Sequence, residues 1–388
     1  MQSMLFSPIQ LRGVRLRNRI VLSPMLTYAA VNGYANDWHL AHLSKFAAGG
    51  TGLVFVESTK VDPRGCSTPR DLGIWKDEFI EPLRRITRLI KQDGAAAGIQ
   101  LSHSGRKARR SVPWEGRAPL AQCPGVDHGE EWELIGPSAV PHGEKYASPR
   151  AMSRDDIQQS IEDWGEAARR ANEAGFDVIE LHGAHGYLIH QFLSPTANRR
   201  TDEYGGSLEN RVRYAVQVVQ RVRQSWPEEK PLFLRVSAID DAGWRIEDSI
   251  ALAKLLHAHG VDVIDCSSGG MSDRSSTEQS TAYGYQVKHS QRIRAGAGVM
   301  TMAVGLIVHS DQAEDILREG SADLIALGRE LLHNPNWPLD AAQKLGIEAP
   351  FAQVPPAYGY WLEKRARSNF GKPSTWQPGL HRRTESNG

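Results

Sequence analysis

The feature that most constrains this chain is the alternation of short apolar runs with amphipathic segments. Eight apolar runs of seven to nine residues recur, at residues 19–25, 52–58, 96–103, 176–183, 231–238, 261–269, 299–307 and 323–330. Nearly continuous apolar runs are typical of parallel strands that are buried on both faces. Between them, residues 78–94 place Ile80, Leu83, Ile86 and Ile90 at helical spacing. Strand and helix alternating eight times predict an α/β fold of the (β/α)₈ TIM barrel type.

The same pattern sets the expected domain limits. We expect one barrel domain over residues 1–350, because a doubly wound sheet would need an early G-x-G-x-x-G turn and the sequence has none. Residues 104–152 follow the third predicted strand and are rich in Pro, Gly and Trp, which indicates a lid or capping excursion over the substrate. Residues 351–388 are expected to form an interface loop followed by a disordered tail.

Composition excludes several classes of function. The formal net charge of +1 over 388 residues offers no electrostatic footprint for nucleic acid or an anionic membrane. No apolar run approaches the roughly 18 residues of a transmembrane helix. Cys66, Cys123 and Cys266 show no C-x-x-C spacing, so neither a disulfide framework nor a zinc or iron–sulfur site fits them. We therefore expect a cytoplasmic protein.

In a barrel, catalytic and binding residues are expected where the strands end. Gly305 ends the seventh predicted strand, and Gly328 with Arg329 ends the eighth. Taken singly, each glycine is explained by a tight turn and Arg329 by a surface ion pair. Together, at two adjacent strands, they favour a phosphate site built from backbone N–H groups and one cation.

Gln100 and Arg235 end the third and fifth predicted strands. A glutamine amide presents a donor and an acceptor to the edge of a flat heterocycle, and an arginine stabilises negative charge on such a ring. A satisfied core amide and a buried ion pair are the alternatives for the two side chains. With the phosphate site, the set fits a flavin mononucleotide (FMN) better than other small ligands.

The segment HGAHGY carries His182, His185 and Tyr187 after the fourth predicted strand. Two imidazole donors aimed at a carbonyl oxygen would polarise a conjugated alkene, and the phenol would supply a proton to the carbon that receives no hydride. His190 is assigned to a structural corner. The rival is a metal-dependent hydrolase or lyase, although the sequence shows no H-E-x-x-H and no further obvious ligands. A third alternative, a non-catalytic flavin carrier, has no need of a proton donor.

Several motifs together resemble the Old Yellow Enzyme family of flavin-dependent ene-reductases. HGAHGYLIHQFLSPTANRRTDEYGGSLENR resembles that family's signature, and LRNRIVLSPM, IQLSHSGRKA, LFLRVSA and ADLIALGREL extend the likeness in order over residues 5–345. IQLSHSGRKA followed by PWEGRAPL and IGPSAVP resembles the thermophilic-like (class III) branch.

The resemblance implies an FMN flavoprotein oxidoreductase that NADPH or NADH reduces and that then passes a hydride to an activated alkene. It implies that His182 and His185 bind the substrate's carbonyl oxygen, that Tyr187 donates the proton, and that Tyr28 lines the pocket. It also implies a homodimer or homotetramer. The residues expected to bind FMN are Pro24, Met25, Ser58, Gln100, His182 and Arg235, with Gly305, Gly328 and Arg329 at the phosphate.

Three positions depart from the family pattern. Leu26 stands where the class III branch usually has a cysteine, so we expect a flavin that is harder to reduce, with desaturation or reaction with oxygen as an alternative activity. Ser58 stands where alanine is common. Near the C-terminus, Gly359, Tyr360 and Trp361 occupy the region of an arginine that closes the neighbouring subunit's pocket. Trp361 is interpreted as a hydrophobic pocket lid or as an aromatic packed at a dimer interface.

Overall fold

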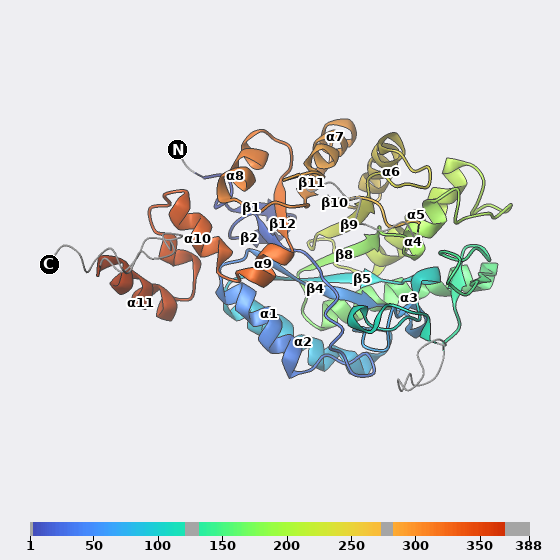
Figure 1. Ribbon diagram of the computed structural model, residues 1–388, viewed down its shortest axis with the longest axis horizontal. Helices are drawn as coiled ribbons and strands as arrows, with labels where there is room; N and C mark the ends of the chain where they lie inside the picture. The colour runs from blue at the N-terminus through green and yellow to red at the C-terminus, as the bar shows by residue number, and fades with distance from the viewer. Residues whose placement is uncertain (1–2, 121–131, 273–281, 369–388) are drawn as a thin grey trace.

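A computed structural model describes residues 3–120, 132–272 and 282–368, and its centre is a closed eight-stranded barrel (Figure 1). Neighbouring barrel strands are parallel and follow one another in chain order around the barrel. The strands are β3 (Ile20–Leu22), β4 (Leu53–Lys60), β5 (Ala96–Ser102), β8 (Val178–Gly183), β9 (Leu232–Ser237), β10 (Val263–Ser267), β11 (Met300–Ala303) and β12 (Leu324–Leu327). Each overlaps one predicted run, so the predicted (β/α)₈ barrel is confirmed.

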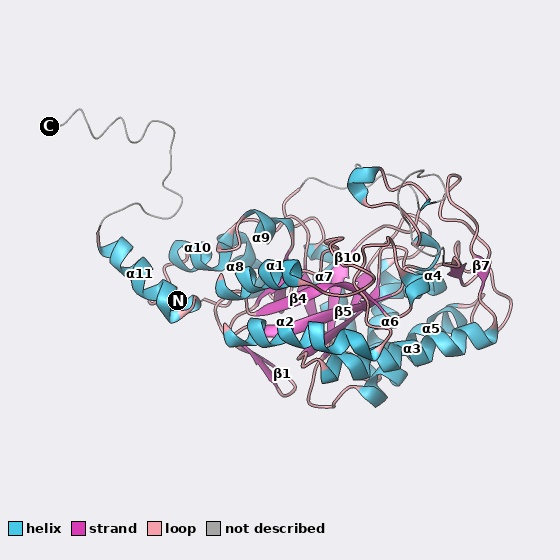
Figure 2. Cartoon of the chain, turned by 90° about the horizontal axis from the view of Figure 1, so that it is seen from below, coloured by secondary structure: helices cyan, strands magenta, loops and turns pink. Residues whose placement is uncertain are grey.

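Helices surround the barrel on its outer side (Figure 2). The helices that follow successive strands are α1 (Asp37–Ala48), α2 (Ile80–Gln92), α3 (Arg154–Glu173), α5 (Leu208–Ser225), α6 (Ile246–Ala258), α7 (Val287–Ala297) and α8 (Ser310–Arg318). As the spacing predicted, α2 buries Ile80, Leu83, Ile86 and Ile90 against the sheet. In the part of the chain that the structure describes, no helix is long and apolar enough to cross a membrane.

The interior of the barrel is filled at the end where the strands begin. Inward-facing side chains such as Val21, Phe55 and Phe233 form an apolar cluster, separate from the larger core between strands and helices. A hairpin that the sequence did not predict, β1 (Ile9–Leu11) and β2 (Val14–Leu16), adds its own buried leucines to this cluster. Because this end is packed with side chains, a ligand can enter only where the strands end.

Strand β4 contains a bulge that decides which of its side chains reach the site. Its pairing with β5 shifts register between Val56 and Ser58. Phe55 faces the barrel interior and Val56 faces the outer core. Glu57 also lies outside, next to His39 of α1, and Ser58 returns to the inner side, where it lines a cavity. A bulge changes the direction of the following side chains in this way.

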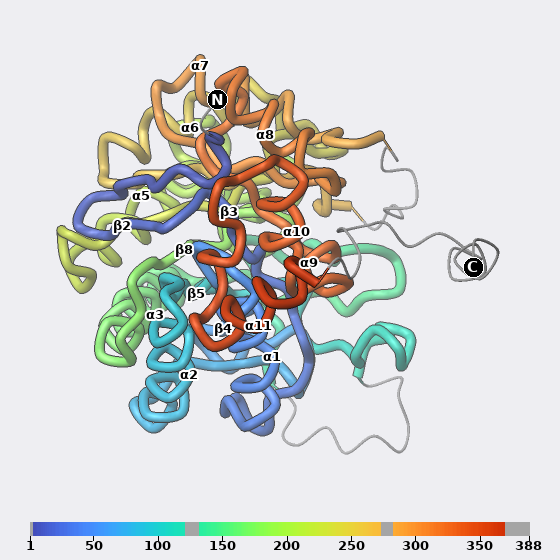
Figure 3. Tube along the Cα trace, turned by 90° about the vertical axis from the view of Figure 1, so that its left-hand side faces the viewer, coloured from blue at the N-terminus to red at the C-terminus, as the bar shows by residue number. Residues whose placement is uncertain are grey.

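Two segments lie outside the barrel repeat. The described part of residues 104–152 contains the short paired strands β6 (Ile135–Gly136) and β7 (Arg150–Ala151), and residues 121–131 of this predicted lid lie outside the described residues. Near the C-terminus, α9 (Arg329–His333), α10 (Trp337–Lys344) and α11 (Pro356–Arg367) follow β12 (Figure 3). Residues 356–367 are thus helical, whereas the sequence suggested a loop there, and residues 369–388 of the expected tail lie outside the described residues.

Candidate active site

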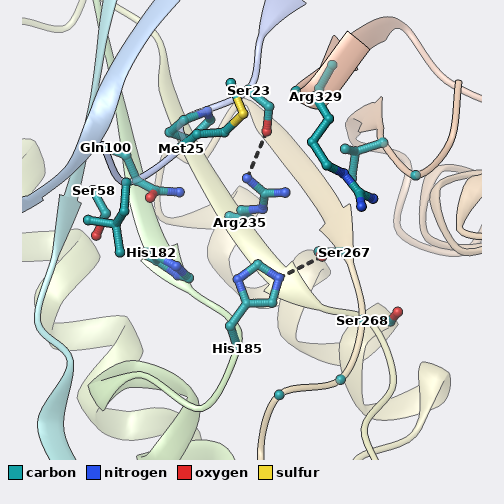
Figure 4. Close-up of a pocket in the computed structure, with 18 of the residues that line it drawn as sticks. Ser23, Met25, Ser58, Gln100, His182, His185, Arg235, Ser267, Ser268 and Arg329 are labelled. Atoms are coloured by element: carbon teal, nitrogen blue, oxygen red, sulfur yellow. Dashed lines mark hydrogen bonds between the residues drawn. The ribbon is translucent and has the colours of Figure 1, made fainter. Parts of the chain in front are cut away.

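A cavity of about 910 Å³ lies where the barrel strands end. Its volume is within the roughly 300–1,000 Å³ of cofactor and ligand sites. Figure 4 shows side chains from several strands converging on it. The predicted site residues that line it are Pro24, Met25, Leu26, Tyr28, Ser58, Gln100, His182, His185, Tyr187, Arg235, Gly305, Gly328 and Arg329. Trp361 is not among the lining residues. It lies on α11 with 66% of its surface exposed, and its place in a partner's pocket stays a prediction.

His182 ends β8 and is buried beside the cavity. The backbone N–H of Ala184 donates to His182 Nδ1 over 3.3 Å. Because Nδ1 accepts, a neutral imidazole carries its proton on Nε2. Burial, followed by His185 and Arg235, holds the pKa of His182 well below its ordinary value. His182 is therefore a neutral N–H donor at neutral pH.

His185 follows β8 in a left-handed conformation with φ 55°. Its backbone N–H donates to Ser237 Oγ (3.0 Å), and Lys107 Nζ donates to its carbonyl oxygen (2.8 Å). Its ring lies 5.2 Å from the His182 ring, centroid to centroid, in an edge-to-face arrangement. These contacts hold an unfavourable backbone conformation that brings the two imidazoles together.

The protonation of the His185 ring follows from its neighbours. Ser267 Oγ lies 2.7 Å from His185 Nε2 (Figure 4). The amide of Gln286 donates to the same Oγ over 3.3 Å. Ser267 can accept from Gln286 and donate its own proton to Nε2, and in that tautomer the imidazole proton is on Nδ1. Burial, followed by Arg235, lowers the pKa of His185 well below its ordinary value. His185 thus offers a second neutral N–H donor.

Tyr187 stands at the start of the short helix α4 (Leu188–Leu193). Its ring centroid lies 4.5 Å from that of His182, and the two rings are tilted by 33°. Its hydroxyl is 3.2 Å from Ser67 Oγ. Two imidazole donors and one phenol therefore meet at the same part of the cavity wall.

A buried polar cluster lies beneath this group. Arg235 Nη1 donates to Ser23 Oγ over 3.0 Å, and its Nε is 3.2 Å from a carboxylate oxygen of Asp265. The Gln100 amide donates to Glu180 Oε1 over 2.8 Å, so its oxygen is left to accept from a ligand. Burial, followed by the charge of Asp265, raises the pKa of Glu180 well above its ordinary value. Burial also raises the pKa of Asp265, and the charge of Arg235 opposes this rise. We therefore assign the proton of the pair to Glu180, and the Asp265 carboxylate balances Arg235.

The β11 and β12 side of the cavity offers backbone and a cation. Gly305 has φ +113°, and a Cβ there would lie 2.6 Å from Gln286 Oε1, so only glycine fits. At Gly328 a Cβ would come within 3.2 Å of Met25 Sδ. Arg329 is exposed and lies across the cavity from Gln100 (Figure 4). A cation and close backbone at one side, with Gln100 and Arg235 at the centre, fit a planar ring with a phosphate tail such as FMN.

Some lining residues were missed by reasoning from strand ends. Lys107, Arg110, Ser111, Pro113 and Arg117 reach the cavity from the 104–152 segment, not from a strand. Lys107 lies inside the motif IQLSHSGRKA, and Pro113 and Arg117 lie inside PWEGRAPL, so for these three the family motifs were the available sequence signal. Ser67, Thr68 and Gln286 also come from loops or helix starts.

Two other observations concern the alternatives. Among residues 3–120, 132–272 and 282–368, no group of three or more His, Cys, Asp or Glu side chains is placed to hold a metal ion. His190 lies away from the cavity, where its Nδ1 accepts from the Gly186 N–H over 3.0 Å and its Nε2 is 3.1 Å from Asp240. Its contacts support the backbone turn that precedes Tyr187.

Comparisons with known proteins agree with this site. Residues 4–348 match the model of the NADH:flavin oxidoreductase / NADH oxidase family. An NADPH dehydrogenase from Geobacillus sp. (strain WCH70) is 46% identical over 350 residues, which cover 89% of this chain and 96% of that protein.

Solved structures show the same fold. Morphinone reductase superposes with a TM-score of 0.72 at 25% identity, covering 89% of this chain and 90% of the other. A 2-naphthoyl-CoA reductase complex superposes with a TM-score of 0.78 at 23% identity, and this chain spans only 53% of its length. The chain therefore belongs to the NADH:flavin oxidoreductase / NADH oxidase family, also called the Old Yellow Enzyme family, with FMN as cofactor and a nicotinamide nucleotide as reductant.

Proposed function

We propose that this protein is an ene-reductase, which reduces the activated C=C bond of α,β-unsaturated carbonyl or nitro compounds at the expense of NADPH or NADH. The observation that carries the proposal is the convergence of His182, His185 and Tyr187 on one cavity that also fits the flavin. When bound, FMN would supply the hydride. The chain's own residues must then bind the substrate's oxygen and deliver a proton.

The two histidines are proposed to bind the oxygen of the substrate. Both are neutral N–H donors, because burial keeps the pKa of each ring well below its ordinary value. Two N–H donors on one oxygen withdraw electrons from the conjugated alkene and stabilise the negative charge that forms on that oxygen. Because the two imidazoles are already held in position, the site does not have to reorganise when this charge forms.

Tyr187 is proposed to be the proton donor. As hydride reaches the β-carbon of the alkene, the electron pair of the C=C bond moves toward the oxygen held by the histidines. The Tyr187 O–H bond then breaks and a C–H bond forms at the α-carbon, so the product is the saturated compound. A positioned acid of this kind contributes about 10²–10⁴-fold to the rate.

The 104–152 segment is proposed to cover the substrate. Trp114 of this segment packs edge-to-face on Tyr28, with ring centroids 5.6 Å apart. Tyr28 lines the cavity and has φ 55°, and burial raises the pKa of its hydroxyl, which stays protonated. The contact links the excursion after β5 to the segment after β3 that carries Leu26.

Turnover of a simple enone tests the proposal. The purified holoenzyme with NADPH and 2-cyclohexenone should form cyclohexanone, detected by gas chromatography. Tyr187→Phe should slow oxidation of the reduced flavin by the enone at least about 100-fold. Its reduction by NADPH should change little, because that step needs no proton from Tyr187. A Tyr187→Phe enzyme that oxidises at the wild-type rate would refute the assigned role.

Leu26 supports a second candidate activity. Its side chain lines the cavity and cannot donate a hydrogen bond, so it does not stabilise the negative charge of a reduced flavin. A flavoprotein of this kind would favour reaction with oxygen or the reverse desaturation. Stopped-flow oxidation of the reduced enzyme by oxygen and by 2-cyclohexenone, at equal concentrations, discriminates the two activities.

A further inference from the structure

A buried ion pair that the proposed function does not use lies behind Tyr187. Lys60 ends β4 with none of its surface exposed, and its Nζ is 3.5 Å from Asp71 Oδ2. Asp71 is held in turn by the backbone N–H of Ser67 (2.6 Å) and by the Thr68 hydroxyl (2.7 Å). A buried ion pair is often no more stabilising than apolar side chains of similar size. Its position therefore calls for a role other than stability.

A chain of hydroxyl groups connects this ion pair to Tyr187. Lys60 Nζ donates to Ser104 Oγ over 3.2 Å. Ser104 Oγ is 2.7 Å from Ser67 Oγ, and Ser67 Oγ is 3.2 Å from the Tyr187 hydroxyl. Lys60 Nζ also lies 4.9 Å from the centroid of the Tyr187 ring. The path is short and continuous, and it is buried from Lys60 to Ser67.

The ammonium group favours one direction of this chain, because it can donate hydrogen bonds but cannot accept them. Ser104 accepts from Lys60 and can pass its own proton on to Ser67. In that direction Ser67 donates to the Tyr187 oxygen. A phenol that accepts from Ser67 keeps its own proton for the cavity.

We propose that Lys60 is a positioning residue that orients the Tyr187 proton toward the substrate through Ser104 and Ser67. This role of Lys60 rests on the proposed role of Tyr187 as the proton donor. It adds the contacts that orient the Tyr187 hydroxyl toward the substrate. After the proton has left, the Ser67 hydrogen bond and the nearby ammonium stabilise the phenolate oxygen. Hydrogen bonds to charged groups are stronger than neutral ones, so the effect is largest in the transition state.

The matched test compares two Ser–Tyr hydrogen bonds in the same fold. Ser67→Ala cuts the chain at Tyr187. Ser160→Ala removes the 2.7 Å contact of Ser160 with Tyr214 between α3 and α5, which is more deeply buried and remote from the cavity. In stopped-flow with reduced holoenzyme and 2-cyclohexenone, Ser67→Ala should slow oxidation about tenfold. Ser160→Ala should not slow it, and Ser67→Thr, which keeps the hydroxyl, should restore most of the rate.

A double-mutant cycle separates positioning from a merely structural effect. Once Tyr187→Phe has removed the donor, adding Ser67→Ala should slow oxidation no further. Lys60→Met should match Ser67→Ala, and the Ser67 variants keep the test valid if Lys60→Met does not fold. A tenfold loss that persists in the Tyr187→Phe background would overturn the inference.

A spectroscopic readout tests the hydrogen bond independently of turnover. In holoenzyme with ring-labelled tyrosine, the infrared difference between wild type and Tyr187→Phe isolates the C–O stretch of Tyr187. Ser67→Ala removes the donor to the phenol oxygen and Lys60→Met removes the group that orients this donor, so both should shift this band, and Ser160→Ala should not. An unmoved band refutes the inference even if Tyr187 is the proton donor. A shifted band in an enzyme whose Tyr187→Phe variant is fully active refutes the proposed function instead.

Discussion

At the scale of single residues, Leu26 makes the most direct prediction about the cofactor. It lines the cavity with a side chain that cannot donate a hydrogen bond. In Leu26→Cys the thiol can donate to the bound flavin and stabilise its reduced form. A hydrogen bond worth about 0.5–1 kcal/mol corresponds to roughly 10–20 mV for a two-electron couple. Photoreduction of both holoenzymes against redox dyes should show the higher potential in Leu26→Cys, and equal potentials would contradict the prediction.

The two buried carboxyl groups beneath Arg235 make a second residue-scale prediction. Glu180 has a raised pKa because of burial and the charge of Asp265, so it is protonated in the folded protein. Glu180→Gln keeps an acceptor for Gln100 and a donor for Asp265, and should cost less than about 1 kcal/mol of unfolding free energy. Asp265→Asn leaves Arg235 without its counter-charge and should cost about 3–5 kcal/mol. Urea unfolding of both variants measures the two losses of unfolding free energy. Equal losses would contradict the assignment of the proton to Glu180.

At the scale of secondary-structure elements, the apolar runs predicted the barrel strands well, but they could not predict the direction of each side chain. Alternation along β4 would place Glu57 inside the barrel and Ser58 outside. The bulge between Val56 and Ser58 reverses this, so Ser58 and Lys60 face inward. A bulge depends on pairing with β5 and on contacts of Glu57 with distant residues, which no local pattern contains. The Lys60 network was missed for this reason.

The contacts of Glu57 make the bulge testable. One Glu57 oxygen accepts from the Thr27 backbone N–H over 2.8 Å, and the other accepts from the Thr27 hydroxyl and lies 3.3 Å from His39 Nε2. Glu57→Gln removes the charge from this buried cluster and replaces an acceptor by a donor. We expect a loss of about 2–3 kcal/mol of unfolding free energy and weaker FMN binding, because Thr27 adjoins Met25 and Leu26. Thermal unfolding and FMN titration of the apoprotein measure the two effects, and a variant unchanged in both would contradict the prediction.

Helix α11 carries Trp361, which was interpreted from the sequence as a hydrophobic pocket lid or as an aromatic packed at a dimer interface. Tyr358, Tyr360 and Trp361 are 56%, 55% and 66% exposed on this helix. If they pack against a second copy, Tyr360→Ser combined with Trp361→Ser should shift the protein toward monomer in light scattering. The fold of the barrel should survive, because neither residue belongs to its core. An unchanged oligomer would show that another surface joins the copies.

At the scale of the whole molecule, the barrel separates stability from chemistry. The end where the strands begin is filled by apolar side chains and by the β1–β2 hairpin, and the other end carries the cavity. The strand-end rule therefore found His182, Gln100 and Arg235 from sequence. It could not find Lys107 or Arg117, which line the cavity from the loop segment that follows β5. The positions of such residues depend on the tertiary path of a loop, which the periodicity of apolar residues does not predict.

Burial of histidines across the molecule predicts its pH stability. Burial lowers the pKa of His42 to about 4, and that of His182 and His185 well below the ordinary value. Below pH 6.5 these histidines become protonated in the unfolded chain but stay neutral in the folded protein. Each one therefore lowers the free energy of unfolding by up to about 1.4 kcal/mol per pH unit. Protonated Glu180 acts in the opposite direction between pH 7 and 5, because the folded state already holds its proton. Histidines with a lowered pKa outnumber carboxyl groups with a raised pKa. The free energy of unfolding should therefore fall by a few kcal/mol from pH 7 to pH 5.

One histidine remote from the cavity isolates this effect. His42 stacks on Trp38 with ring centroids 4.7 Å apart, and neither lines the active-site cavity. His42→Gln removes one group that must stay neutral in the folded state, so its unfolding free energy should fall less steeply between pH 7 and pH 5 than that of wild type. His333→Gln, at an exposed position of α9, is the matched control for the loss of one histidine. Urea unfolding of the holoenzymes followed by tryptophan fluorescence gives the three slopes. A His42→Gln slope equal to the wild-type slope would mean that the folded protein protonates this ring as readily as the unfolded chain does.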